Sequence, residues 1–502
     1  MFLRLVVLVG CFAGLRLLFR VYRHLTSPLR SVPGPFLARF TNLWYFWKLT
    51  PGSFEVTNQE LHEKYGPIVR YGPNRYSFDD PTAVKAIYGH GTQFIKSTWY
   101  ESWMPRGVWS LFSERNIHDH SQYRRQYQKE YSMSSLVEYE PLVNECADLF
   151  GQRLEEFSRS GELFNMGHWM QCYALDVVGS ITYSRRLGYL DRGEDIGGIK
   201  SALESNLFVG TLVGVYPFLH PYPSMVDASR HGSDKGITYA INLTLEALAE
   251  RQKVTDEEEQ APVKVKDFLH KFIAKNNHDS DTFTTYHIMQ GCAMNIVAGS
   301  DTTGISLSAC LYFLLKHPQC YAKLREEIMG SGRTGAESRD ISFKQSQEMP
   351  YLQAVLKEAL RLHPATGLPL ERIVSAGGAT IAGRFFPAGS IVGVNTWIEH
   401  RNTHIFGTDA NEFRPERWLS DDAEKVATMN SHWMPFGYGS RTCIGRHISF
   451  LEISKLIPRL VRDFDFELSG DLAARGSTWA TDNYWFVKPT NFMVRVTPRK
   501  EL

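Results

Sequence analysis

Residues 436–445, near the C-terminus, contain the side chain with the clearest potential for chemistry, a cysteine in a glycine-rich segment. The segment reads Phe-Gly-Tyr-Gly-Ser-Arg-Thr-Cys-Ile-Gly, and its glycines permit sharp turns. Cys443 directly precedes a helical apolar pattern over 448–460, so a helix dipole and free backbone N–H groups would stabilise its thiolate. Arg441 adds a positive charge two residues earlier. The pattern indicates an anionic sulfur ligand, and a glycine-rich turn around a structural cysteine is the alternative.

The chain has seven cysteines, and only Cys443 has neighbours of this kind. No Cys-x-x-Cys pair occurs, which excludes a zinc ribbon and a thioredoxin-type redox motif. The low cysteine density of such a long chain also argues against a disulfide framework. We therefore expect most of the other cysteines to be small buried hydrophobes.

Every fixed position of the spacing F-x-x-G-x-R-x-C-x-G is met by residues 436–445. The segment resembles the haem-binding loop of the cytochrome P450 family. The resemblance implies a bound haem b (iron protoporphyrin IX) with Cys443 as the axial thiolate ligand, which would push electron density onto the iron and favour O–O cleavage. It also implies that Phe436 shields the sulfur and that Arg441 pairs with a haem propionate.

A second segment, Ala-Gly-Ser-Asp-Thr-Thr at 298–303, lies inside a long helical pattern over 285–316. A glycine costs about 1 kcal/mol relative to alanine in a helix interior, and a threonine hydroxyl can bond the carbonyl four residues back. The segment is similar to the family's oxygen-activation motif. That similarity implies a groove for dioxygen beside Gly299 and proton delivery by Asp301 and Thr302. A polar patch on an exposed face is the alternative.

Glu358 and Arg361 are three residues apart on a predicted helix, a spacing that by itself usually marks a surface ion pair of little worth. Arg417 lies in Phe-Arg-Pro-Glu-Arg-Trp at 413–418. Together the two segments resemble the family's E-x-x-R helix and P-E-R-W segment. The resemblance implies a buried structural network of Glu358, Arg361 and Arg417, in which the loss of one member would leave an unpaired charge.

Three further basic residues match positions that contact haem propionates in the family. His120 and Arg124 are four residues apart in 119–125, and Arg372 follows Leu-Pro-Leu-Glu. Two propionate anions at low dielectric need cationic partners, and Arg is well suited to bind them. For His120 and Arg124, an ordinary basic helix face is the alternative.

The N-terminal residues have the character of a membrane segment. An apolar run over 5–15 is followed by basic residues and by Ser-Val-Pro-Gly-Pro at 31–35. A cleaved signal peptide is the alternative, but no small-residue cleavage site follows. We expect a signal anchor over 1–24, a basic and Pro-rich hinge over 25–35, and a catalytic domain over 36–502. Because positive charge lies mostly on the C-terminal flank, the protein is predicted to be single-pass in the endoplasmic reticulum membrane with a cytosolic catalytic domain.

Composition limits the class of protein. The chain has 502 residues, of which 43% are hydrophobic and 22% charged, and its mean hydropathy of −0.27 excludes a polytopic membrane protein. Lys and Arg number 55 against 54 Asp and Glu, so the positive excess of a general nucleic-acid binder is missing.

The apolar periodicity is mainly helical. Helices are predicted over 142–157, 285–316, 351–363 and 447–464, and strands over 68–71, 379–381, 391–394 and 492–496. The expected fold class is therefore mainly α with a minor β portion, and the resemblance implies the cytochrome P450 fold. The chemistry-bearing residues must converge on one cofactor, which argues for one large domain.

The resemblance implies a haem-thiolate monooxygenase that inserts one oxygen atom from O2 into an apolar small molecule. Electrons would come from an NADPH-dependent cytochrome P450 reductase, because no G-x-G-x-x-G strand–helix segment is present. The residue patterns of 395–401 and 483–486 look closest to those of filamentous-fungal, pisatin demethylase-like members, which implies secondary-metabolite biosynthesis. A haem-thiolate isomerase or dehydratase and a non-catalytic haem protein are the alternatives, and Asp301 with Thr302 favours oxygen activation over both.

Two further sets of residues are expected, the second of them partly because the resemblance places a substrate-covering loop there, with an ordinary surface or core role as the alternative for each. The basic docking face for an acidic reductase is predicted at Arg125, Lys129, Arg446 and Lys455. Substrate contacts are predicted at Trp99, Tyr100, Trp103, Met104, Asn295, Ala298, Ala365 and Thr366.

Overall fold

The computed structural model describes residues 14–499 apart from 17, 20, 23–24, 105–107, 220–232, 253–265, 331–340 and 475–477. The predicted signal anchor over 1–24 therefore lies mostly outside the described residues. Within the described part of the chain, no helix combines the length and the apolar character needed to cross a membrane. The division into anchor, hinge and catalytic domain stays a prediction.

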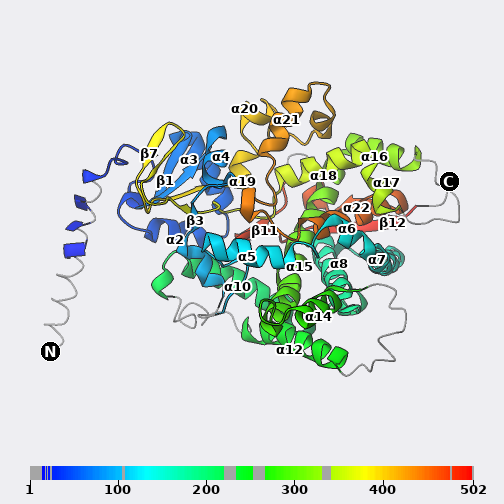
Figure 1. Ribbon diagram of the computed structural model, residues 1–502. Helices are drawn as coiled ribbons and strands as arrows, with labels where there is room; N and C mark the ends of the chain where they lie inside the picture. Colours follow the sequence, from blue (N-terminus) through cyan, green and yellow to red (C-terminus); the bar gives the residue numbers. More distant parts are fainter. Residues whose placement is uncertain are drawn as a thin grey trace, which may run out of the picture.

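Helices make up most of the described chain, and Figure 1 shows most of the long ones at the right and below. The long helices are α3 (Phe54–Tyr65), α5 (Ile117–Tyr127), α7 (Glu140–Ser160), α8 (Met166–Tyr183), α10 (Ile199–Val213), α12 (Ser233–Gln252), α14 (Phe268–His278), α15 (Thr285–Lys316), α16 (Pro318–Gly330), α18 (Pro350–Leu362), α21 (Ala423–His432) and α22 (Arg446–Asp463). The shorter ones are α2 (Leu43–Leu49), α4 (Pro81–Tyr88), α6 (Met133–Leu136), α9 (Tyr189–Arg192), α17 (Phe343–Gln347), α19 (Thr396–Glu399), α20 (Thr403–Phe406) and α23 (Gly470–Ala473). Single 3-10 turns are η1 (Leu37–Arg39), η2 (Thr98–Trp103), η3 (Val137–Tyr139), η4 (Ile196–Gly198), η5 (Pro217–Leu219), η6 (Pro415–Leu419) and η7 (Gly439–Arg441).

A five-stranded sheet lies at the upper left of Figure 1, close to α2, α3 and α4. Its order is β1 (Ile68–Gly72), β2 (Arg75–Phe78), β8 (Ile391–Val394), β5 (Arg372–Ile373) and β3 (Ile95–Lys96). β2 and β8 are parallel, and the other neighbouring pairs are antiparallel. The sheet therefore joins segments from both ends of the sequence, and its β3–β5 edge carries two basic residues.

The remaining strands form small sheets. β4 (Phe164–Asn165), β12 (Met493–Pro498) and β9 (Phe464–Leu468) make a three-stranded antiparallel sheet in that order. β6 (Ala379–Ile381) pairs with β7 (Arg384–Phe386), and β10 (Thr481–Tyr484) pairs with β11 (Phe486–Pro489). The buried apolar residues form one large cluster among the helices, a second one around the five-stranded sheet and α2–α4, and a small third one around Phe406 and Trp418.

The predicted fold class, mainly α with a minor β portion, is confirmed. The predicted helix over 285–316 and the predicted strands over 379–381 and 391–394 coincide with α15, β6 and β8. The other helices agree to within a few residues. α15 is well defined because Thr284 and His287 form a capping box at its start.

Glycines on α15 let α8 approach closely. A Cβ on Gly299 would lie 2.8 Å from the Val178 side chain, and a Cβ on Gly304 would lie 3.0 Å from the Gln171 backbone. Gly299 therefore faces a neighbouring helix, and the dioxygen groove beside it stays a prediction. The small size of this glycine serves helix packing.

Candidate functional site

Cys443 lies in a tight loop just before α22. Its backbone N–H donates to the Phe436 carbonyl at 2.8 Å and closes the loop. Within the loop Gly439 has a φ of +65°, and a Cβ there would lie 1.9 Å from the carbonyl oxygen of Tyr88 on α4. Both the backbone angle and the close approach require glycine. The Phe436 ring packs at the base of the loop, 5.2 Å from Phe450.

The Cys443 side chain is exposed, whereas the other cysteines in the described part of the chain are buried. Desolvation by the surrounding protein raises the pKa of the Cys443 thiol, and backbone N–H groups of Gly445 and Arg446 oppose this shift together with the guanidinium of Arg124. Arg124 and Arg446 are the charges that oppose the shift, and the stabilisation of the thiolate by Arg441 stays a prediction. A bound metal ion would deprotonate the thiol outright.

Basic side chains from separate elements gather beside this loop and influence one another's ionisation. They are Lys96, His120, Arg124, Arg372 and Arg441. Burial and the charges of Arg441 and Lys96 lower the pKa of His120 to about 2. Burial and the charges of Arg372 and Arg441 hold the pKa of Lys96 well below its usual range. The set includes every basic residue predicted to contact the propionates, and the structure adds Lys96.

Strand pairing places two of these cations opposite each other. Lys96 on β3 is the register partner of Arg372 on β5, and like charges directly opposite destabilise a sheet. Lys96 donates to the Phe112 carbonyl at 2.5 Å, and Arg372 donates to the Glu371 carbonyl at 2.9 Å. A lysine within the mainly apolar and aromatic stretch 94–100 is the only sequence signal for Lys96, and it points to no ligand by itself.

Arg441 joins the cysteine loop to the start of α5. Its guanidinium donates to the carbonyls of Glu114 at 2.6 Å and Arg115 at 3.2 Å. The next residue, Asn116, caps α5 by accepting hydrogen bonds from backbone N–H groups of the first turn. Arg441 therefore fixes the helix that carries His120 and Arg124.

The basic cluster forms no ion pair among the described residues, although the charge of Glu114 partly opposes the lowering of the pKa of Lys96 and of Arg441. Within the described ranges, no carboxylate forms an ion pair with Lys96, His120, Arg124, Arg372 or Arg441, and the hydrogen bonds of Lys96 and Arg441 go to backbone carbonyls. Basic groups at a desolvated site are costly to charge without an anion, so the cluster fits a ligand that brings negative charge. The two propionates of haem match this need, and the exposed Cys443 thiol matches its iron.

The middle of α15 carries an open strip between buried residues. Ala298 is exposed and Thr302 is half-buried, whereas Ile296, Ser300 and Thr303 are buried. The Thr302 hydroxyl donates to the Ala298 carbonyl at 2.8 Å, which is the bond to the residue four positions back that the sequence predicts.

The two adjacent threonines have different surroundings. Thr303 is buried and its hydroxyl lies 2.9 Å from that of Ser449 on α22. Because Ser449 is only six residues beyond Cys443, this bond brings the centre of α15 to the cysteine loop. Asp301 is buried beside them and accepts a hydrogen bond from Gln171 of α8.

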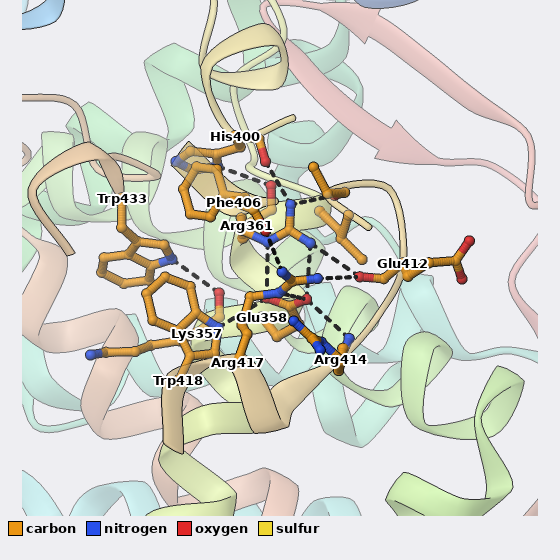
Figure 2. A network of polar contacts seen from close by, with 12 residues as sticks. Lys357, Glu358, Arg361, His400, Phe406, Glu412, Arg414, Arg417, Trp418 and Trp433 are labelled. Atoms are coloured by element: carbon orange, nitrogen blue, oxygen red, sulfur yellow. Dashed lines mark hydrogen bonds and ion pairs between the residues drawn. The ribbon is translucent and has the colours of Figure 1, made fainter. Parts of the chain in front are cut away.

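Glu358, Arg361 and Arg417 form one buried network, shown in Figure 2. Both oxygens of Glu358 accept from Arg361 at 2.9 Å, and Oε1 also accepts from Arg417 at 2.8 Å. Trp418 donates to Oε2 at 2.9 Å. The other guanidinium N–H groups reach Asp409 Oδ1 and the backbone carbonyls of His400, Phe406, Asp409, Ala410 and Glu412.

The structure tests several of the residues predicted to contact the reductase or the substrate. Lys455 is buried and pairs with Glu140 at 2.8 Å, so its prediction as a docking residue is wrong. Arg125, Lys129 and Arg446 are exposed. Asn295 is buried and bonded to the hydroxyls of Tyr131 and Thr182, which gives it a structural role.

The predicted substrate-contact residues fall into two groups. Trp99 and Tyr100 are buried, and Trp99 packs against Trp103 and Trp485, with ring centroids 5.1 and 4.9 Å apart. Ala365 accepts a backbone hydrogen bond from Val487 on β11, and the neighbouring Thr366 bridges to the same hairpin. The aromatic cluster and this hairpin are therefore neighbours. Met104 is half-buried.

The family profile of cytochrome P450 matches residues 33–476, so the chain belongs to the cytochrome P450 family. The predictions of the family, of a monooxygenase and of a cysteine-ligated haem are confirmed. Pisatin demethylase of Fusarium vanettenii is 38% identical over 488 residues, covering 96% of this chain and 92% of the relative. A cytochrome P450 monooxygenase of Aspergillus terreus is 38% identical over 461 residues, covering 89% and 93%. One of Emericella nidulans is 36% identical over 502 residues, covering 98% of both chains.

Proposed function

We propose that Cys443 is the axial ligand of the haem iron and that the basic cluster beside it holds the propionates. The observation that carries this assignment is the exposed Cys443 thiol next to five basic side chains without a carboxylate partner. When bound, the haem supplies the oxidation chemistry, in which O2 is activated at the iron and one oxygen atom passes to the substrate. The ring of Phe436 would shield the sulfur from solvent.

Asp301 and Thr302 are proposed to deliver protons on the substrate side. In its simplest form the reaction converts R–H, O2, NADPH and one proton into R–OH, water and NADP⁺. The second oxygen atom must take up protons to leave as water, and positioned acid groups accelerate such transfers. The Thr302 hydroxyl lies on the open strip of α15, and the Asp301 carboxylate lies on the same helix turn. An isomerase would have no use for this supply of protons.

The electron donor is proposed to be NADPH-cytochrome P450 reductase. Arg125, Lys129 and Arg446 are exposed basic groups on the elements around Cys443, and a basic surface attracts an acidic partner. The physiological substrate is proposed to be an apolar small molecule of fungal secondary metabolism. The support is the similarity to fungal monooxygenases, among them an enzyme named for pisatin.

The protein is proposed to be single-pass in the endoplasmic reticulum membrane with its catalytic domain in the cytosol. Exposed apolar side chains on η1, α2 and η5 support contact with a lipid surface. They are Phe36, Leu37, Leu43, Trp47 and Phe218. Phe46 of α2 packs 5.9 Å from Tyr216, which packs 5.7 Å from Phe218, so these segments are neighbours.

A reduced carbon monoxide difference spectrum tests the ligand assignment first. We expect the Soret band typical of thiolate ligation, and its absence would overturn the assignment of Cys443. A panel of apolar fungal metabolites, with pisatin included, is then incubated with enzyme, reductase and NADPH. Product formation that needs both reductase and O2 supports a monooxygenase, whereas conversion without either would indicate an isomerase.

Thr302→Ala tests the proton-delivery role. We expect this variant to keep the carbon monoxide spectrum while releasing more peroxide per NADPH. Thr303→Ala is the matched control, because it removes a neighbouring hydroxyl that bonds Ser449. Equal peroxide yields from wild type and Thr302→Ala would contradict the role.

A further inference from the structure

The carboxylate of Asp301 is connected to the surface by a chain of charges. Its Oδ1 lies 3.4 Å from Nζ of Lys488 on β11, and Lys488 lies 2.7 Å from Glu204 on α10. Side-chain exposure rises from 2% at Asp301 to 25% at Lys488 and 53% at Glu204. The chain of charges therefore runs from the buried centre of α15 to solvent, between α10 and the C-terminal hairpin.

One oxygen of Asp301 is held and the other is not. Oδ1 accepts from Gln171 and contacts Lys488, whereas the buried Oδ2 has no hydrogen-bond partner in the described part of the chain. Gln171 is itself fixed, because its backbone packs against Gly304. A carboxylate oriented through one oxygen can gain or lose a proton on the other without losing its orientation.

The carboxylates around Lys488 favour its charged form. Burial opposes its charge, but the carboxylates of Asp301 and Glu204 raise the pKa of Lys488 above its usual value. Burial lowers the pKa of the neighbouring Lys200, whose Nζ lies 2.8 Å from His168 Nδ1. Lys488 therefore supplies the positive charge that holds Asp301.

We propose that Lys488, held by Glu204, is a positioning residue for Asp301, and that solvent protons enter the protein at this pair. The inference rests on the proposed function and deepens it, because it gives the proton supply of Asp301 and Thr302 a starting point at the surface. It also gives the hairpin of β10 and β11 a role in oxygen chemistry.

Oxygen stoichiometry measures the proton supply without an organic substrate. Reduction of O2 to peroxide consumes one NADPH and one proton, whereas reduction to two water molecules consumes two NADPH and two protons. A slower proton supply moves the NADPH to O2 ratio from two toward one. Holoenzyme, reductase and NADPH are sufficient for this assay.

Four variants are compared with the wild type. We expect Lys488→Met to release roughly twofold or more peroxide per O2, Lys488→Arg to restore the wild-type ratio, and Glu204→Gln to lie between them. Lys271→Met is the matched control, because Lys271 pairs with Glu138 at 3.1 Å. The exposures of this lysine and glutamate, 13% and 59%, are similar to those of Lys488 and Glu204. We expect this control to behave as wild type.

Two measurements do not depend on turnover. The infrared stretching frequency of carbon monoxide bound to the reduced enzyme depends on the polar groups near the bound molecule. We expect Lys488→Met to shift this frequency and Lys488→Arg to restore it. Thermal unfolding of Asp301→Asn, Lys488→Met and the double variant tests the pairing, and we expect non-additive shifts of the midpoint.

Additive unfolding midpoints would overturn the proposal, as would a Lys488→Met enzyme with the wild-type stretch and oxygen stoichiometry. A wild-type protein without the thiolate-type spectrum would instead refute the proposed function. The unfolding cycle would still test the Lys488–Asp301 pair in that case, so the two failures can be told apart.

Discussion

The buried Glu358 network and the partly buried basic cluster beside Cys443 both contain arginine, but they differ in their charge balance. In the Glu358 network, the guanidiniums of Arg361 and Arg417 face the carboxylates of Glu358 and Asp409, and backbone carbonyls take up further N–H groups. In the basic cluster beside Cys443, the described residues supply no carboxylate partner. The comparison teaches that a charge cluster which the chain neutralises by itself stabilises the fold, whereas an unbalanced one marks a ligand site.

The largest effect is expected from Glu358→Gln. The substitution leaves two fully buried guanidiniums without their shared carboxylate, which costs about 3–5 kcal/mol. That is a large part of the roughly 5–15 kcal/mol by which a protein is stable. Soluble yield and chemical unfolding measure the loss, and Glu155→Gln, in an exposed pair with Arg159, is the control with little effect. A Glu358→Gln protein as stable as the wild type would show that the Glu358 network does not stabilise the fold.

Cys443→Ala should leave the fold intact and abolish haem binding. The residue is exposed, so we expect soluble protein without a thiolate-type carbon monoxide spectrum and without turnover. Cys310→Ala, at a buried cysteine on α15, is expected to keep the spectrum at a small cost in stability. A thiolate-type band in Cys443→Ala would show that another cysteine binds the iron.

Arg124→Gln should separate haem retention from apoprotein stability. Removing one cation from an unbalanced set relieves repulsion in the haem-free protein, so its stability should stay the same or rise. Haem loss should become about tenfold faster for each 1.4 kcal/mol of lost binding. Transfer of haem to apomyoglobin measures the rate, and Arg125→Gln, at the exposed neighbour, is the control. A destabilised apoprotein with normal haem retention would place Arg124 with the structural network.

Glu452 on α22 is a third case, a single buried carboxyl with no hydrogen-bond partner among the described residues. Burial raises its pKa well above the usual value. The Glu452 carboxyl therefore stays protonated in the folded protein above a pH of about 4.3, where the same carboxyl loses its proton in the unfolded chain. The stability of the fold falls as the pH rises from this value toward the raised pKa of the folded state.

Glu452→Gln cannot ionise and should lose this pH dependence. We expect similar melting temperatures for wild type and variant near pH 4–5. At pH 8 we expect a higher melting temperature for the variant, by the shift that a stability difference of roughly 1 kcal/mol produces. Glu155→Gln is again the control. Parallel pH profiles for wild type and Glu452→Gln would mean that a counter-charge reaches Glu452 after all.

Local sequence predicted the elements that have strong local signals. The helix over 285–316 coincides with α15 because its apolar period and its capping residues agree. The motifs around Cys443 and Glu358 were also found by type and spacing, since their residues lie close together in the sequence. Lys455 shows the limit, because a basic residue on an amphipathic helix is predicted to be exposed until its partner Glu140 is known.

The sequence by itself determined the family, the mainly helical fold and the identity of Cys443 as the distinctive cysteine. These follow from patterns within a few turns of chain. Only the tertiary structure decided that Lys96 faces Arg372, that Gly299 packs on α8 and that Lys488 reaches Asp301. Each of these depends on which distant segments become neighbours, and electrostatic interactions act through the distance between charges in space rather than along the chain.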